Sequence, residues 1–191
     1  MTIFLLGLLA FLGVHSTGLF APQWRQAQRQ SLGEGRWKAL YSLASLASLG
    51  LMVWGFSIAR ADPVVLWVPP RGIRHMVIAG MLPVFVLLAA SGGKGRIRQW
   101  VGHPMSLAIA IWALLHLLAD GRLAPTLLFA GFLAWAAILV FVRRARDRNA
   151  NVQHRAAGFA PDALALAAGT LVWALFLFFG HEWLIGVRPL G

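Results

Sequence analysis

The sequence predicts an all-α, polytopic transmembrane helix bundle of about six spans, with five to seven possible. Of the 191 residues, 59% are hydrophobic and only 12% are charged, whereas charged residues make up about a quarter of an ordinary soluble domain. The apolar residues form runs close to the length of about 20 residues that a helix needs to cross a bilayer. Short connections rich in glycine, proline and charge separate these runs. We therefore expect one transmembrane domain over residues 1–191.

Six apolar runs are the predicted spans: Thr2–Ala21, Trp37–Ala59, Ile73–Ala90, Pro104–Ala119, Ala124–Val142 and Asp162–Gly186. The first run has no basic segment ahead of it and no persuasive cleavage site, which favours a retained span over a signal peptide. The fourth run is the shortest and reaches only about 24 Å at 1.5 Å per residue. We expect other helices to surround it.

The basic residues lie in the connections between the apolar runs, which argues against nucleic-acid binding despite a net charge of +11. Cytoplasmic loops of membrane proteins carry an excess of lysine and arginine. The odd-numbered connections and their flanks hold twelve of the 17 basic residues and the other side holds five, namely Arg60, Arg71, Arg74, Arg122 and Arg188. We expect a multi-pass protein of a bacterial inner membrane, in contact with lipid, with both termini in the periplasm.

Cysteine is absent and only six residues are acidic. This composition excludes disulfides, thiolate ligands, iron–sulfur clusters and covalently attached c-type haem. It also leaves few carboxylates for metal-assisted hydrolysis.

Four of the six histidines are expected near the surface of the membrane or in solvent. His154 lies in the long basic fifth connection and is expected to be solvated. His75 and His181 fall at the outer ends of the third and sixth spans. His103 precedes Pro104, a residue well suited to the first turn of a helix.

His15 and His116 lie inside predicted spans, at depths that agree within about two helical turns. A polar side chain at such a depth is a functional hypothesis by default. Small and aromatic residues share the helical face of each histidine and could accommodate a flat ligand; these are Gly7, Phe11 and Gly18 beside His15, and Ala108, Trp112 and Asp120 around His116.

Two interpretations of this pair remain open from the spacing alone. The imidazoles could hydrogen-bond across helices, as polar side chains often do in membranes. Alternatively, they could be the two axial ligands of one b-type haem, since histidine is a standard ligand of haem iron. A rival pair at matched depth is His75 with His181.

Several local motifs together resemble the NnrU family, over most of the chain through about Val142. They are GlyValHisSer at 13–16, the run LeuGlyGluGlyArgTrpLysAlaLeuTyrSerLeuAlaSer at 32–45, GlyHisPro at 102–104 and TrpAlaLeuLeuHisLeuLeuAlaAspGly at 112–121. The resemblance implies a membrane protein associated with denitrification and nitric-oxide metabolism.

The NnrU family is similar to zeta-carotene isomerase, a haem b membrane enzyme of plants and cyanobacteria that isomerises a cis double bond. That enzyme's histidine pattern falls here on His15, His103 and His116. The resemblance implies haem b held by His15 and His116. His103 lies roughly 20 Å from His116 along the same helix, too far for both to bind one iron, so we expect His103 to tune the site without binding iron. The resemblance also implies a hydrophobic or nitric-oxide-type ligand. A cysteine of the isomerase is replaced by Ala113, which excludes an exchange between thiolate and imidazole ligands.

A second class of function is also compatible with the sequence. HisPro at the start of a membrane helix resembles the ArgHisPro motif with which isoprenylcysteine and phospholipid methyltransferases help bind S-adenosylmethionine. Here Gly102 replaces the arginine, and the acidic residues that follow near the C-terminus are reduced to Glu182, with Arg188 beyond it. A non-catalytic accessory protein for a reductase complex is the third alternative.

Overall fold

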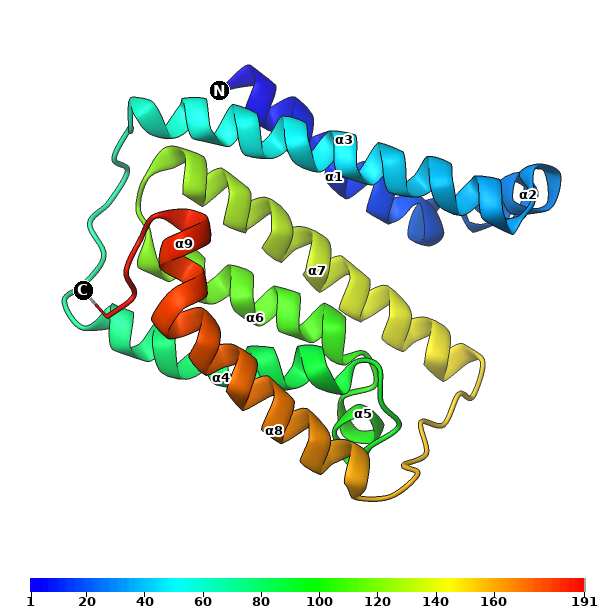
Figure 1. Cartoon of the computed structure of the whole chain (residues 1–191). Helices are drawn as coiled ribbons and strands as arrows, with labels where there is room; N and C mark the ends of the chain where they lie inside the picture. The colour runs from blue at the N-terminus through cyan, green and yellow to red at the C-terminus, as the bar shows by residue number, and fades with distance from the viewer. Residues whose placement is uncertain (191) are drawn as a thin grey trace. The chain divides into compact units, whose positions relative to one another are not determined.

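The computed structural model describes residues 1–190, and helices joined by short connections account for most of them (Figure 1). Five helical segments are long and apolar enough to cross a membrane: α1 (Thr2–Phe20), α3 (Glu34–Ala61), α4 (Ile73–Ala90), α7 (Leu123–Asn149) and the continuous run of α8 (Ala160–Leu175), η1 (Phe176–Gly180) and α9 (His181–Ile185). The shorter apolar helix α6 (Pro104–Ala119) is the sixth predicted span. The prediction of an all-α transmembrane protein of about six spans is therefore confirmed.

Two helices lie in connections for which the sequence predicted no span. These are α2 (Pro22–Leu32) and the one-and-a-half-turn helix α5 (Arg96–Val101). The helix α7 also continues past the predicted end at Val142 to Asn149. Arginine is a good helix former, and basic side chains near a helix C-terminus interact favourably with the helix dipole. These properties account for the extension of α7.

The chain divides into two compact units, and each is described by itself. The first comprises Met1–Leu66 and Arg122–Gly131, and the second comprises Trp67–Gly121 and the chain from Phe132 onward.

In the first unit, α1 and α3 run antiparallel and pack closely. A Cβ atom added to Gly7 of α1 would lie 2.5 Å from the Cα atom of Met52, and one added to Gly55 of α3 would lie 2.5 Å from the Cα atom of Phe4. The glycines therefore allow the two backbones to approach, as small residues commonly do between membrane helices. Gly7, which the sequence placed on the ligand face of α1, is a helix-packing residue in this unit.

In the second unit, α4 packs against both α6 and α8. Val84, Leu87 and Ala108 form the buried centre of this packing. A Cβ atom added to Gly169 of α8 would lie 2.6 Å from the Cα atom of Val86, so that α4 and α8 are also in close contact. The indole Nε1–H of Trp173 donates a hydrogen bond to the carbonyl oxygen of Ile78 at 3.1 Å.

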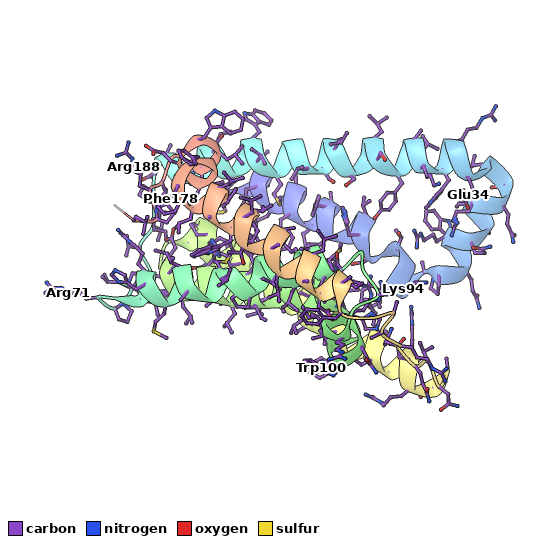
Figure 2. All side chains as sticks on the ribbon, turned by 60° about the horizontal axis from the view of Figure 1, so that its bottom comes forward. Glu34, Arg71, Lys94, Trp100, Phe178 and Arg188 are labelled. Atoms are coloured by element: carbon purple, nitrogen blue, oxygen red, sulfur yellow. The ribbon has the colours of Figure 1, made fainter. Side chains whose placement is uncertain are left out.

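Apolar side chains project outward along the helices, whereas the labelled cations Arg71 and Lys94 lie in connections at helix ends (Figure 2). Leu9, Leu46 and Leu164, for example, are each about two-thirds exposed. An apolar outer surface of this kind is suited to contact with lipid. The chain is a multi-pass membrane protein.

Candidate functional site

His15 is oriented by its own helix in the first unit. Its Nδ1–H donates to the carbonyl oxygen of Phe11, one turn earlier on α1, at 2.8 Å. A carbonyl oxygen only accepts, so the proton must be on Nδ1 and the lone pair of the neutral ring on Nε2. The hydroxyl of Ser45 on α3 contacts Nε2 at 3.5 Å. The ring of Phe11 stacks on the imidazole with 4.2 Å between ring centroids.

His116 has the same local geometry in the second unit. Its Nδ1–H donates to the carbonyl oxygen of Trp112, one turn earlier on α6, at 2.9 Å. The lone pair of the neutral ring is again on Nε2. The centroids of the Trp112 and His116 rings are 5.4 Å apart, and Trp112 also packs edge-on against Phe132 of α7.

An apolar cavity of about 320 Å³ lies in the second unit, and His116 lines it. The cavity is bounded by α4, α6 and the α8–α9 run. Its aromatic walls are Phe85, Trp112, Trp173 and Phe176. A preformed apolar cavity with few polar groups is the usual form of a small-molecule or cofactor site.

His181, which the sequence offered only as part of the rival pair with His75, also lines this cavity. Its Nδ1–H donates to the carbonyl oxygen of Val187 at 2.7 Å. The residue follows directly after the π-helical segment η1, which belongs to the same continuous helical run as α8 and α9. Segments of π-helix are frequent at functional sites. His75, by contrast, is exposed on the first turn of α4.

The two histidines predicted as ligands lie in different compact units. His15 lies on α1 of the first unit, together with Gly7, Phe11 and Gly18. His116 lies in the second unit, together with Trp112 and His103. Their pairing stays a prediction. Gly18 lies beside Arg25, since a Cβ atom added there would come 2.9 Å from the guanidinium.

His103 lies at the other end of α6 from His116, where it is the residue before the helix. Its Nε2 atom is 2.9 Å from the Oδ2 atom of Asp147 on α7. Burial lowers the pKa of His103 below its ordinary value, and the Asp147 carboxylate partly opposes this shift.

The prediction of a solvated His154 is wrong. Its side chain is only 21% exposed, and its Nε2–H donates to the same carboxylate oxygen of Asp147 at 2.7 Å. The pairing depends on the extension of α7, which carries Asp147 beyond the predicted end of the span. Asp147 is the one acidic residue among the arginines at 143–148. This isolated acid was the feature of the sequence that could have indicated a partner for His154.

A multi-pass helical membrane protein with histidines set inside its apolar helices is the class that the fold and these sites define. Within that class, the chain belongs to the NnrU family, because the family model described as NnrU protein matches residues 3–189. The match includes the last span, which carries less of the resemblance seen in the local motifs. No curated protein and no solved structure matches the chain significantly.

Proposed function

We propose that this protein binds one non-covalent b-type haem and that His116 is an axial ligand of the iron. The observation that carries the proposal is the orientation of the imidazole. Its Nδ1–H is held by the Trp112 carbonyl oxygen, and the ring lines an apolar cavity. Histidines that bind metals usually donate their second ring N–H in this way, which fixes the ring and makes the other nitrogen more basic.

His15 is the proposed second ligand. It repeats the hydrogen bond from Nδ1 to the carbonyl oxygen one turn earlier, and it lies within the span-length helix α1. His181 is the rival, since it lines the same cavity as His116. We favour His15 because the hydrogen bond of His181 is exposed to solvent and because the zeta-carotene isomerase pattern includes His15.

The donor groups and cavity walls suit haem. The sequence contains no cysteine, so imidazole is the available strong ligand, and the aromatic walls can pack on a flat macrocycle. Bound haem would supply iron for one-electron transfer or for binding a small molecule such as nitric oxide. The residues of this chain would hold the imidazoles and exclude water from the iron.

The family resemblance favours a role in nitric-oxide metabolism or denitrification at a bacterial inner membrane. The charge distribution favours periplasmic termini, because twelve of the 17 basic residues lie on the opposite side.

Isomerisation of a hydrophobic substrate is a second candidate, since almost all residues lining the cavity are apolar. A methyltransferase would need an acidic residue near its C-terminus. The residue available here, Glu182, already forms an ion pair with Arg188.

The absorption spectrum of the purified protein tests this proposal. Protein extracted in detergent should contain about one haem per chain and show a sharp Soret band, and nitric oxide should perturb the reduced spectrum if one coordination position opens. Colourless protein that does not take up added haem would contradict the proposal. Binding of S-adenosylmethionine by such colourless protein would favour the methyltransferase instead.

A further inference from the structure

We propose that His103, Asp147 and His154 form a binding site for a divalent transition-metal ion of the Zn²⁺ type. The three residues come from different segments of the second unit: the residue before α6, the C-terminal end of α7 and the connection between α7 and α8. Their ligand atoms all lie within 4.8 Å of one another. The site is independent of the proposed haem ligands.

The donor atoms already converge on one point. The Nε2 atoms of His103 and His154 are 2.9 Å and 2.7 Å from the same Oδ2 atom of Asp147. Two imidazoles and one carboxylate form a ligand set found in catalytic zinc sites and in non-haem iron sites. All three side chains are at most a quarter exposed, so the cluster differs from a solvated group of surface charges.

The Nε2 atom of His103 gives a second reason to expect a ligand. It is buried and contacts the Asp147 carboxylate at 2.9 Å, but without the direction of a good hydrogen bond. A buried polar atom that lacks a well-directed hydrogen bond is costly. A metal ion between the three side chains would provide this nitrogen with a directed bond.

A cavity of about 510 Å³ adjoins the cluster and is lined by Asp147 and His154. Arg144 and Arg148 also line it, and these cations would repel a bare dication. An anion bound at the fourth coordination position would be attracted both by the metal and by the arginines. We therefore expect a tetrahedral site with three protein ligands and one exchangeable anionic ligand from the cavity.

Gly102 shapes one wall of the site. A Cβ atom added to it would lie 3.7 Å from the Nε2 atom of His154, and its φ of 75° lies in the left-handed region that favours glycine. The metal would join the start of α6 to the end of α7 and to the following connection. It would thereby hold the connection that contains His154.

Zinc binding by the full-length protein tests the proposal directly. The purified protein is dialysed against Zn²⁺ buffered by a competing chelator, and bound zinc is measured by mass spectrometry. Wild type should bind one ion per chain. His154→Ala and Asp147→Asn should each weaken binding by at least about tenfold, the lower limit for loss of even an outer-shell partner. His75→Ala, which removes an exposed histidine outside the cluster, should bind as wild type does. Equal zinc affinity in wild type and the two cluster variants, or no binding by wild type, would overturn the proposal.

Limited proteolysis of the wild-type protein tests it without a substitution. Zn²⁺ should slow trypsin cleavage after Arg155, which directly follows His154, and should leave cleavage after the exposed Arg71 unchanged. Absence of protection at Arg155, or equal protection at both sites, would also overturn the proposal.

Discussion

His116 and Trp112 are joined by a hydrogen bond within α6, from the imidazole Nδ1–H to the backbone carbonyl oxygen at 2.9 Å. The imidazole is therefore anchored to the backbone of its own helix. His15 and Phe11 have the same relationship on α1 at 2.8 Å. In both cases, the nitrogen left with the lone pair is Nε2, the atom through which we propose that each histidine binds iron.

We predict that added imidazole restores the haem spectrum of His116→Gly. This substitution removes the proposed ligand from the wall of an apolar cavity and should leave space in which free imidazole can bind iron. Absorption spectra before and after addition of imidazole check the prediction. His75→Gly, in which an exposed histidine is removed, should show the wild-type spectrum throughout. No response of His116→Gly to imidazole would count against direct ligation by His116.

We predict that Gly7→Ala lowers the free energy of unfolding by about 1–3 kcal/mol, the usual cost of overpacking. The added methyl group would collide with the backbone at Met52, and backbone atoms cannot move aside as a flexible side chain can. Gly13→Ala is the matched control on the same helix, because no atom lies within 4 Å of an added Cβ there. It should be neutral or stabilising by up to about 1 kcal/mol. Thermal unfolding in detergent measures both, and equal stabilities would refute the packing role of Gly7.

The lengths of the apolar runs were sufficient to predict the spans. The start of α6 at Pro104 and both ends of α4 coincide with the predicted limits. Two features depended on information that hydropathy lacks. The end of α7 depends on the helix propensity of its arginines, and the contact of His154 with Asp147 follows from that extension. The place of His181 in the cavity depends on tertiary packing around α4 and α6, which no local pattern encodes.

We predict that Asp162→Ala destabilises α5 and the connection before it. Asp162 is buried and accepts hydrogen bonds from the backbone N–H groups of Arg96 and Ile97 at 2.7 Å and 3.0 Å. Loss of such a cap costs about 0.5–2 kcal/mol. The variant should unfold at lower temperature and be cut faster by trypsin after Arg96.

Glu182→Ala is the comparison for the Asp162 variant, because Glu182 forms an ion pair with the largely exposed Arg188. An exposed pair contributes about 0–1 kcal/mol, so this change should have the smaller effect. If Asp162→Ala unfolds no more readily than Glu182→Ala, the carboxylate does not stabilise α5.

We predict that the connection between α7 and α8 is cytoplasmic. The chain has no cysteine, so single cysteines can be introduced at Ala150 and at Asp62 and labelled with a membrane-impermeant maleimide. Ala150→Cys should react in inverted vesicles and not in spheroplasts, and Asp62→Cys should show the opposite pattern. A reversed pattern would overturn the orientation derived from the basic residues.

Coordination of the iron by His15 and His116 is the central claim, and absorption spectra of single and double histidine variants test it most directly. We predict that His15→Ala and His116→Ala each shift the Soret band and retain less haem, that the double variant is colourless, and that His181→Ala keeps the wild-type spectrum. A folded His15→Ala/His116→Ala variant with a six-coordinate, low-spin spectrum would contradict the claim. A wild-type spectrum in His15→Ala together with a shifted one in His181→Ala would instead assign the second ligand to His181.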